Sequence, residues 1–503
     1  MTADSKHSEW SERASGLSGR ASESSGKHSE LNAAARGIFL HALEACGIES
    51  AMERHFCVDL NQDGKGVLRV AGAAEIPLAG VRHLRVMAMG KAALPMLDSV
   101  LRAVSRVEGM DVAGICDGPQ FPAVRDARIR YFAGGHPVPN RDSFEAAEAM
   151  LEMARGLGQG LGQGDVALFL LSGGASAMLE LPLDRAIGLE DTAEFYRALV
   201  HSGAAIAEIN CVRKHFSAVK GGRLGAAAAG ASRVLTLAVS DVPADQLHAL
   251  GSGPTLPDDS SMGECMEIIR RYGLMERFPA SVRRYFEEMA AAAEGLEAEG
   301  LEKTGRVETS SGLAANLSAN PSGNPSGNPS GEFVVLLSNE DLVERAKERA
   351  EALGFHVEID NACDDWECSA AAAYLLERLR ELRAEHGRVC LLSGGEITVH
   401  VAGTPGVGGR NQQFALACAL RMDAADGRVA VLSAGSDGVD GNSEAAGAVV
   451  DAGFVDRAKA MGLDPERSLA AFDAGRLFEQ TGDGIVTGAT GNNLRDLRIL
   501  LGD

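Results

Sequence analysis

The sequence predicts an α/β protein with two domains, each built around its own sheet. Three apolar segments run straight into loops rich in glycine and serine: Val166–Leu171, Val389–Leu392 and Val429–Leu432. Such segments are typical of buried strands, and their alternation with helical patterns predicts a mostly parallel sheet. The chain has 503 residues, which is too many for one compact core and favours two domains.

The first half of the chain alternates between helical and strand patterns from about Leu31 onward. The expected strands are Leu84–Met89, Val112–Cys116, Ile129–Phe132, Val166–Leu171 and Val234–Val239. The expected helices are Leu31–Cys46, Ala92–Val107, Ala204–Gly221 and Ser143–Arg155, the last with Asp142 as its N-cap. The glycine-rich run Gly156–Gly164 precedes a strand, whereas a dinucleotide-binding fingerprint follows one, so we interpret this run as a flexible connector.

The second half of the chain shows a similar alternation. The expected strands are Phe333–Leu337, Phe355–Ile359, Val389–Leu392, Ile397–Val401 and Val429–Leu432. The expected helices are Leu342–Leu353, Ser369–His386 and Gln412–Met422. Because Ile397–Val401 follows its glycine-rich loop with no helix between, we expect antiparallel pairing and therefore a mixed sheet.

Two segments of low complexity bound these regions. Residues 1–30 are polar and rich in Ser, Gly, His and Glu, which predicts a disordered tail. Residues 288–331 include Asn-Pro-Ser-Gly three times in succession, which indicates a flexible linker or insertion. We therefore expect the first domain at 31–287 and the second at 332–503.

Composition narrows the class of protein. Asp and Glu total 70 against 48 Lys and Arg, and the net charge of −22 argues against nucleic acid and acidic membranes as partners. The nine cysteines are scattered without a Cys-x-x-Cys pair, which is typical of free thiols in a cytoplasmic protein. The N-terminus lacks an apolar signal region and no stretch is long enough to span a bilayer. Small molecules are the expected partners, and a homodimer is left open.

Two candidate site residues follow predicted strands of the first domain. Gly90 and Lys91 form a strand-to-helix turn, where a lysine can point at an anion held by the helix N-terminus. A solvated lysine is the competing interpretation. His136 lies in the rigid turn Gly135–Asn140, where it can position a substrate, transfer a proton or simply pack beneath the turn.

Small residues also follow the strand Val166–Leu171. They permit close approach of a ligand, and their free amides suit phosphate or carboxylate, although tight strand–helix packing is an alternative. The residues are Ser172, Gly173, Gly174 and Ser176. Asp241 closes the strand Val234–Val239, where it can hold Mg²⁺, accept a hydroxyl proton or form an ordinary Asx turn.

The segment Ile209–Arg223 is densely basic for so acidic a chain. On a helix, four of its polar side chains could project together, although ordinary helix-surface charge is an equally good interpretation. These side chains are Asn210, Arg213, Ser217 and Lys220.

The segment Gly406–Gln413 is the most specific local signal. Gly408 and Gly409 lead to Arg410 at the start of a helix, where a guanidinium can make planar, multidentate contacts with phosphate oxygens. Asn411 adds an amide contact. A flexible loop that only caps the helix is the alternative.

Two acids follow the strand Val429–Leu432. Asp437 and Asp440 can bind a hydrated Mg²⁺ or supply a base, and a plain Asp-Gly turn is the serious competitor. With Asp241 they are the candidate metal ligands.

Taken together, these motifs resemble the class II glycerate kinases, the glycerate 2-kinases with a C-terminal MOFRL domain. In order and approximate spacing the match covers about Leu31 to Leu501. The chain departs from the family at Ala489, where Pro is usual, and at Leu337–Glu340, where a Gly-Ser-Asn turn is usual. The matching stretches are Gly90–Ala93, Gly135–Pro139, Ser172–Met178, Asn210–Leu224, Ser240–Pro243, Ser252–Thr255, Ser393–Glu396, Gly408–Gln412, Ala434–Gly441 and Thr487–Asn493.

This resemblance implies ATP-dependent phosphorylation of D-glycerate to 2-phosphoglycerate, with Mg²⁺ as the metal. It also implies a larger Rossmann-like domain and a smaller MOFRL-type domain, with the active site in the cleft between them. The resemblance makes Lys91 and Arg410 the leading catalytic candidates. Asp241 or Asp437 would hold Mg²⁺ or accept the hydroxyl proton, and the sequence does not choose between them.

One alternative is a different enzyme, an NAD(P)H-dependent reductase of hydroxypyruvate or tartronate semialdehyde. Such an enzyme is expected to carry Gly-x-Gly-x-x-Gly after a strand, with an acid about 20 residues further on. We find no convincing example in this chain. A non-catalytic sensor of sugar acids is a second alternative.

Overall fold

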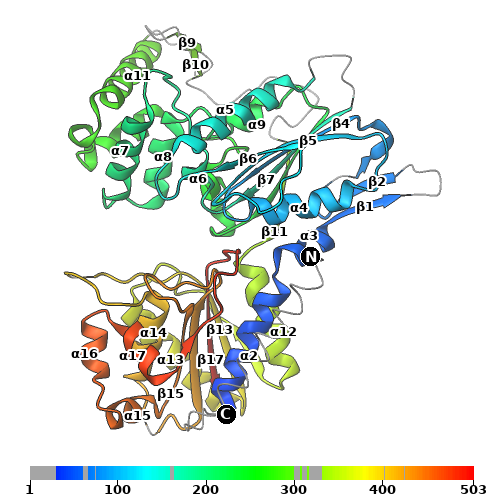
Figure 1. The fold of residues 1–503 in the computed structure, drawn as a ribbon. Coiled ribbons are helices and arrows are strands. Elements are labelled where there is room, and N and C mark those ends of the chain that lie inside the picture. Colours follow the sequence, from blue (N-terminus) through cyan, green and yellow to red (C-terminus); the bar gives the residue numbers. More distant parts are fainter. Residues whose placement is uncertain are drawn as a thin grey trace.

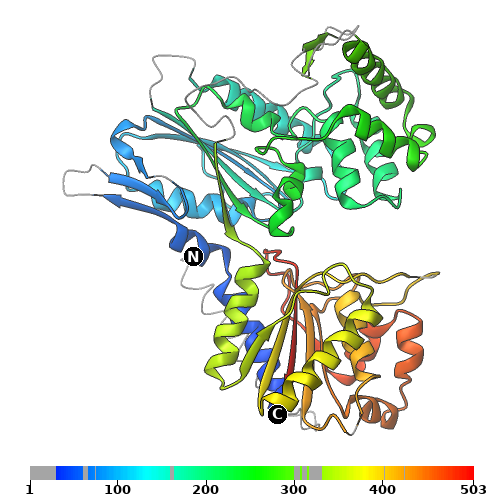
Figure 2. The same cartoon turned by 180° about the vertical axis from the view of Figure 1, so that it is seen from behind.

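The computed structural model has two lobes, each built on a six-stranded sheet (Figures 1 and 2). It describes residues 30–60, 66–73, 75–158, 164–298, 306–308, 314–316, 331–401, 403–423 and 425–503. The predicted tail up to residue 29, the middle of the Gly156–Gly164 connector and most of the Asn-Pro-Ser-Gly repeat lie outside the described residues.

The first sheet is entirely parallel, where a mostly parallel sheet was predicted. Helices connect most of its successive strands, but the segment 119–128, which joins the strands at 111–118 and 129–133, contains no helix. Its order is β11-β8-β7-β4-β5-β6. Alternate residues of each strand face opposite layers: Val86 and Ala88 of β4 join the core beneath α4, whereas Met87 and Met89 join the core beneath α5. The strands are β4 (His83–Met89), β5 (Asp111–Gly118), β6 (Ile129–Ala133), β7 (Asp165–Ser172), β8 (Arg233–Val239) and β11 (Glu332–Leu337).

Helices cover both faces of this sheet and extend beyond one end. They are α4 (Ala93–Val104), α5 (Arg141–Gly156), α6 (Ala175–Met178) and α9 (Arg223–Ala227) near the sheet, and α7 (Leu189–Val200), α8 (Ile206–Phe216), α10 (Met262–Arg271) and α11 (Ala280–Ala298) beyond it, with the 3₁₀ segments η2 (Ala244–Ser252) and η3 (Met275–Arg277). The outer helices share an aromatic core that includes Phe195, Phe216 and Phe286.

The second sheet is mixed, in the order β12-β13-β17-β14-β15-β16. Only β12 and β13 pair in parallel, because β17 runs antiparallel between β13 and β14. One face packs against α2 and α12, and the other against α13, α14 and α17. The strands are β12 (His356–Ile359), β13 (Val389–Gly395), β14 (Val429–Gly435), β15 (Gly447–Asp451), β16 (Gly484–Ile485) and β17 (Asp496–Gly502); the helices are α2 (Glu30–Ala45), α12 (Asn339–Ala352), α13 (Cys368–Glu385), α14 (Arg410–Ala419), α15 (Phe454–Ala460), α16 (Pro465–Ala470) and α17 (Ala474–Thr481).

The two sheets do not coincide with the predicted ranges 31–287 and 332–503. Helix α2 comes from the N-terminal range but packs on the second sheet, where Asn32 Nδ2 donates to Asp451 Oδ2 at 3.0 Å. Strand β11 comes from the C-terminal range but pairs with β8 of the first sheet. The chain therefore crosses between the lobes after α2 and again after β11, as Figure 1 shows.

Several smaller elements were not predicted. The chain forms α3 (Ile48–His55), then an antiparallel sheet of β1 (Phe56–Leu60), β2 (Gly66–Val70) and β3 (Ile76–Pro77), followed by η1 (Leu78–Gly80). Within the predicted linker 288–331, α11 continues to Ala298, and β9 (Arg306–Glu308) pairs with β10 (Ala314–Asn316).

Three local predictions were wrong. Ile397–Val401 is not a strand; only Thr398 forms an isolated bridge there, with Glu367, and the antiparallel pairing comes from β17 instead. The N-cap of α5 is Asn140 rather than Asp142, because the Asn140 side chain accepts the Ser143 amide in a capping box. Helix α8 ends at Phe216, not Gly221, because Ser217 leaves the helix to bridge with Pro182.

Candidate active site

The carboxyl ends of β4, β6, β7 and β8 gather the predicted residues of the first lobe at one sheet edge. We call this group, Lys91, His136, Ser172–Ser176 and Asp241, the first edge. Parallel strands end on the same side, so residues far apart in sequence meet there. A Cβ placed on Gly174 would lie 3.2 Å from Lys91 Cγ and 3.5 Å from His136 Cδ2.

Two glycines permit this close packing. Gly90 has φ of +104°, and a Cβ there would lie 2.5 Å from the Ser172 carbonyl oxygen. A Cβ on Gly173 would lie 2.0 Å from Asp241 Oδ2, so the Asp241 carboxylate rests directly on the Gly173 backbone. Only glycine fits at either position, because any side chain would displace the loop or the carboxylate.

Ser172 holds the turn that carries Lys91. Its hydroxyl accepts the Ala92 amide at 2.9 Å and donates to the Met89 carbonyl at 3.3 Å. The Lys91 amide donates to the Gly173 carbonyl at 2.9 Å. The Lys91 side chain makes no ion pair within the described residues, and the acid that its charge affects is Asp241.

The positive charge of Lys91 changes the pKa values of the titratable side chains around it. Burial lowers the pKa of His136, and the positive charges of Lys91 and Arg213 lower it further. Burial raises the pKa of Asp241, which Lys91 opposes. His136 is therefore held neutral beside two cations.

Asn210, Arg213 and Ser176 are brought together through Ser252. The Ser252 hydroxyl donates to Asn210 Oδ1 at 3.0 Å and lies 2.7 Å from the Ser176 hydroxyl. Arg213 Nη1 donates to Ser176 Oγ at 3.4 Å, its guanidinium stacks 4.6 Å from the centroid of the Tyr196 ring, and its buried Nε has no partner among the described residues.

Lys220 does not join this group. Because α8 ends at Phe216, Lys220 turns into the core, where Nζ lies 2.7 Å from Glu180 Oε2 and 3.0 Å from the Leu179 carbonyl. The side chains of Lys220 and Glu180 are 1% and 0% exposed, so the lysine is a buried structural ion pair rather than a ligand contact.

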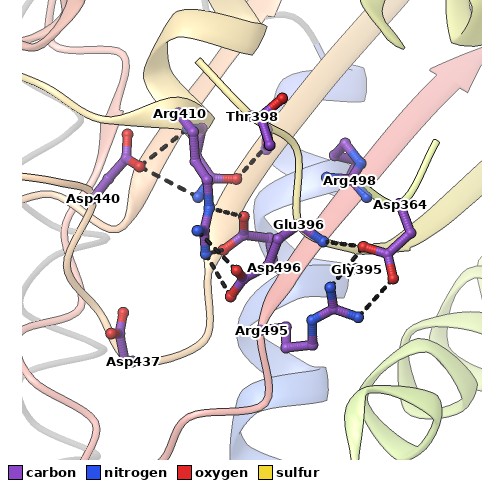
Figure 3. A network of polar contacts seen from close by, with 12 residues as sticks. Asp364, Gly395, Glu396, Thr398, Arg410, Asp437, Asp440, Arg495, Asp496 and Arg498 are labelled. Carbon is purple, nitrogen blue, oxygen red and sulfur yellow. Dashed lines mark hydrogen bonds and ion pairs between the residues drawn. The ribbon is translucent and has the colours of Figure 1, made fainter. Parts of the chain in front are cut away.

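Arg410 lies at the corresponding edge of the second sheet, at the start of α14 (Figure 3). It is not free. Its Nε and Nη2 donate to Asp496 at 2.5 and 3.1 Å, and Nη1 donates to Glu396 at 3.0 Å. Burial opposes the charge of Arg410, but the two carboxylates outweigh it and raise its pKa. The guanidinium is thus fixed in place with its charge compensated.

A second arginine pair lies beside it. Arg495, in the left-handed region with φ of +65°, donates to both oxygens of Asp364 at 2.8 and 2.6 Å. Burial alone would raise the pKa of Asp364, but the hydrogen bonds from Arg495 and from the Glu396 amide, together with the charges of Arg495 and Arg498, lower it overall. We call Asp364, Glu396, Arg410, Asp437, Arg495 and Asp496 the second edge.

The sequence interpretation missed Asp364, Glu396, Arg495 and Asp496 as individual site residues. One signal was available: Asp496 and Arg498 interrupt an otherwise apolar C-terminal strand, and Arg495 directly precedes it. Arg498 is fully buried, and its guanidinium donates to the Gly394 carbonyl. Nothing comparable marks Asp364, which lies in a turn far from its partner.

Asp440 is not available to a metal ion. Its two oxygens accept the amides of Asn411 and Gln412 at 3.0 and 2.8 Å and so cap α14. Burial raises its pKa to about 7, against the effect of those two amides. Asn411 is equally occupied: its side chain accepts the Ser433 hydroxyl at 2.6 Å.

The two glycines before α14 shape the approach to Arg410. The Gly408 amide donates to Asn442 Oδ1 at 2.8 Å, and Gly409 is the N-cap of α14. The Gly408 amide therefore serves the loop, and the Gly409 carbonyl accepts the Gln413 amide at 3.0 Å as the helix begins.

Asp437 is half-buried, and one of its oxygens accepts the Val439 amide at 3.1 Å. A Cβ on Gly435 would lie 3.3 Å from both Asp437 Oδ1 and Asp496 Oδ1, so the two carboxylates flank one point. Across the described part of the chain, no three His, Cys, Asp or Glu side chains lie close enough to hold a metal ion together. The predicted trio of Asp241, Asp437 and Asp440 is therefore not a single metal site.

The two edges meet at Asp241. Asn493 Nδ2, from the loop before β17, donates to Asp241 Oδ2 at 3.3 Å across the lobes. Burial raises the pKa of Asp241, and the charge of Arg495 on the second edge opposes that rise. Lys91 and the Arg410 network thus belong to one region between the lobes.

Known proteins share this arrangement of two domains. Residues 34–287 match the model of a domain of unknown function, DUF4147, and residues 389–496 match the MOFRL family. A D-glycerate 2-kinase from Thermotoga maritima is 32% identical over 429 residues, covering 84% of this chain and 92% of the relative. The chain belongs to the MOFRL-domain glycerate 2-kinase family.

Solved structures of this glycerate 2-kinase family share the fold. The crystal structure of a glycerate kinase from Thermotoga maritima superposes with a TM-score of 0.72 at 29% identity, over 94% of this chain and 99% of the other. A relative from Agrobacterium vitis, provisionally named a hydroxypyruvate reductase, is 34% identical over 83% of this chain and 86% of its own length. No helix among the described residues has the length and apolarity needed to cross a membrane.

Proposed function

We propose that this protein is a kinase that transfers the γ-phosphoryl group of ATP to the 2-hydroxyl of D-glycerate. The observation that carries the proposal is the junction of two unlike edges at the Asn493–Asp241 hydrogen bond. One edge offers Lys91 and Arg213, which form no ion pair among the described residues, and the other offers carboxylates around a fixed arginine. Phosphoryl transfer needs positioning and charge neutralisation more than covalent chemistry from the protein.

The first edge binds the anionic groups. Lys91 is placed to contact the transferring phosphoryl group or the glycerate carboxylate, and Arg213 offers a buried Nε that has no partner in the described chain. Both reactants are anions, so these positive charges reduce the repulsion between them.

Asp241 accepts the proton of the glycerate hydroxyl. The hydroxyl oxygen forms its bond to the γ-phosphorus as the bond to ADP breaks, and the hydroxyl proton passes to the carboxylate. Burial already raises the pKa of Asp241, which makes its carboxylate a better base.

The donor set of the second edge fits Mg²⁺. Magnesium in kinases is usually held by one or two carboxylates together with phosphate oxygens and water, and Asp437 offers such a carboxylate at a point that the Arg410-bound Asp496 also flanks. Bound there, Mg²⁺ would neutralise charge on the phosphates. Arg410 keeps Asp496 in place through two hydrogen bonds, so it acts by positioning that carboxylate.

Phosphorus NMR of the product formed from ATP and D-glycerate tests this proposal. We expect 2-phosphoglycerate and ADP, with no reaction when ATP or Mg²⁺ is omitted. The reductase alternative predicts oxidation of NADH by hydroxypyruvate at substantial turnover, a result that would defeat the kinase proposal. Tight glycerate binding without ATP turnover would favour a sensor instead.

Two further points concern the cellular location of the protein and its oligomeric state. All nine cysteines are free thiols, which favours a cytoplasmic location. The sequence left a homodimer open, and light scattering of the purified protein, which distinguishes the mass of one chain from that of two, decides between the two states.

A further inference from the structure

The turn Gly251–Gly253 beside the first edge lies in the left-handed region of backbone space. Gly251, Ser252 and Gly253 have φ values of +57°, +60° and +63°. Glycine adopts this conformation freely, but in other residues the Cβ comes too close to the following carbonyl oxygen. Ser252 therefore carries a side chain at a position where the backbone alone favours glycine.

Hydrogen bonds from a neighbouring turn hold this conformation. The Ser252 carbonyl accepts the Gly221 amide at 3.2 Å, and the Gly253 carbonyl accepts the Gly222 amide at 2.7 Å. The segment η2, which ends at Ser252, packs against both α6 and α8. Ser252 thus cannot take up a more favourable φ without breaking these contacts.

The Ser252 hydroxyl joins α8 to α6. The side chain is completely buried, and its hydroxyl donates to Asn210 Oδ1 at 3.0 Å. Asn210 Nδ2 donates to the Ala249 carbonyl at 3.5 Å, which supports this orientation of the amide. A hydroxyl has only one proton, so the 2.7 Å contact between Ser252 and Ser176 must be donated by Ser176. Ser252 therefore fixes the direction of the Ser176 proton.

This direction of the proton suits Arg213. Arg213 Nη1 donates to the Ser176 oxygen at 3.4 Å, a contact that needs a lone pair on that oxygen rather than its proton. The guanidinium also stacks on the Tyr196 ring, 4.6 Å from its centroid. Arg213 is only 7% exposed, and its buried Nε has no partner among the described residues. The chain of hydroxyls thus supports a buried cation that still has an unused donor.

We propose that Ser252 is a positioning residue for the anionic substrate: its hydroxyl orients Ser176, and Ser176 holds Arg213 ready for a carboxylate or phosphate oxygen. Ser252 lies behind Ser176 and acts through it. The anionic oxygen belongs either to the glycerate carboxylate or to a phosphate of ATP. This inference rests on the proposed kinase function and adds to it a residue behind the site.

The first test compares Ser252→Gly with Ser252→Ala. Both variants remove the hydroxyl, but only glycine relieves the left-handed backbone. We expect kcat/KM to fall about tenfold in both, because the hydroxyl is lost in both. The urea midpoint of Ser252→Gly should be the higher of the two. If kcat/KM of either folded variant stays within about twofold of the parent value, the proposal is overturned.

The separate KM values identify the anionic oxygen that Arg213 contacts. A rise in the KM of glycerate alone identifies the carboxylate, and a rise in the KM of ATP alone identifies a phosphate. A loss of kcat with both KM values unchanged would overturn the proposal, because Arg213 would then hold neither reactant.

Two further variants separate positioning from packing. Ser176→Ala with Ser252→Gly should lose no more kcat/KM than the worse single variant, because one residue acts through the other. Additive losses would contradict this. The matched control is Ser202→Gly, which removes a hydroxyl that donates to the Leu199 carbonyl at 2.6 Å, between α7 and α8. It should keep kcat/KM within about twofold of the parent value, and a tenfold loss there would reduce the effect at Ser252 to general destabilisation.

A binding experiment tests the positioning role without turnover. Inorganic phosphate is titrated into the whole protein while NMR follows the ring resonance of His136. The phosphate concentration for half-maximal shift should rise about fivefold in Ser252→Gly. An unchanged concentration, or no response in the parent protein, would overturn the inference. A parent protein that binds phosphate but does not phosphorylate glycerate would count against the proposed function alone.

Discussion

The two edges carry similar motifs but use their charges differently. On the first edge, Lys91 has no ion-pair partner among the described residues. Its charge adds to the effect of burial that lowers the pKa of His136, and it opposes the burial that raises the pKa of Asp241. On the second edge, Arg410 is held by Glu396 and Asp496. A basic residue in a glycine-rich loop therefore supplies net charge to a ligand in one case and orders carboxylates in the other.

This difference gives the site a polarity. Anionic groups of the reactants are favoured beside Lys91, and a cation is favoured beside Asp437 and Asp496. The second edge carries four carboxylates and three arginines, so negative charge is in slight excess there. The carboxylates are Asp364, Glu396, Asp437 and Asp496, and the arginines are Arg410, Arg495 and the buried Arg498. Substitutions that remove each charge in turn test whether the two edges differ in this way.

Removing Lys91 is expected to have the largest effect on turnover. Lys91→Ala should lower kcat about 10³-fold, because a charge aimed at the transferring group is lost. The unfolding free energy should stay within about 0.5 kcal/mol of the parent value, since no ion pair within the described residues is broken. Steady-state kinetics and urea unfolding measure the two effects. Near-normal turnover would mean that the site is misplaced.

Removing Arg410 is expected to affect stability as well as turnover. Arg410→Ala leaves Glu396 and Asp496 without their partner, so we expect a loss of about 2 kcal/mol, less than for a fully buried pair because the arginine is 35% exposed. Turnover should fall about 10²-fold through the displaced Asp496. Arg410→Lys is the matched variant and should recover stability more than turnover. Loss of turnover alone would contradict the positioning role.

The two neighbouring acids should separate a metal role from a structural one. Asp437→Asn is expected to raise the Mg²⁺ concentration for half-maximal rate about tenfold. Asp440→Asn should leave that concentration unchanged and cost about 1 kcal/mol of stability through the weakened cap of α14. Titration of the rate with Mg²⁺ at saturating ATP distinguishes them. Equal shifts in both variants would reject Asp437 as the ligand.

The sequence predicts most strands and the loops that follow them, since a run such as Val166–Leu171 buries both faces and must end in a turn. It therefore also predicts which residues reach the carboxyl edge of the first sheet. Lys91, Ser172 and Asp241 each follow directly from the end of a strand. Their local geometry depends on neighbours close in sequence.

The partners of the charged residues could not be predicted, because they depend on contacts distant in sequence. Arg410 meets Asp496 only because β17 inserts antiparallel between β13 and β14. Lys220 seemed to belong to a helical stripe, but Ser217 ends α8, and the lysine turns toward Glu180. Periodicity gives the direction of a side chain only while the helix continues.

Substitution of Lys220 tests whether this residue lies outside the candidate site, because it should change the stability of the protein and not its turnover. Lys220→Met leaves the Glu180 carboxylate buried, and we expect about 3 kcal/mol of destabilisation in urea unfolding. The folded fraction should keep kcat and KM within about twofold of the parent values. Adding Glu180→Gln should recover part of the stability. A large loss of kcat in a stable Lys220→Met protein would return this lysine to the site.

The smallest expected effect concerns the titration of His136. Its folded pKa lies below the unfolded value, so the stability it contributes is present above the unfolded pKa of about 6.5 and is lost as the pH falls through the folded value. Lys91→Met removes one of the cations that lower this pKa. The His136 pKa should therefore rise in the variant, and the fall in unfolding free energy at acidic pH should become smaller.

NMR of histidine-labelled protein measures that titration directly. Lys347→Met is the matched control, because Lys347 lies on α12 of the second lobe, paired with Glu344. Inorganic phosphate should also raise the His136 pKa in the parent protein, since an anion on the first edge offsets Lys91 and Arg213. If Lys91→Met and Lys347→Met titrate alike, the charge of Lys91 is compensated after all. The contrast between a free lysine and a held arginine would then no longer explain how the two edges differ.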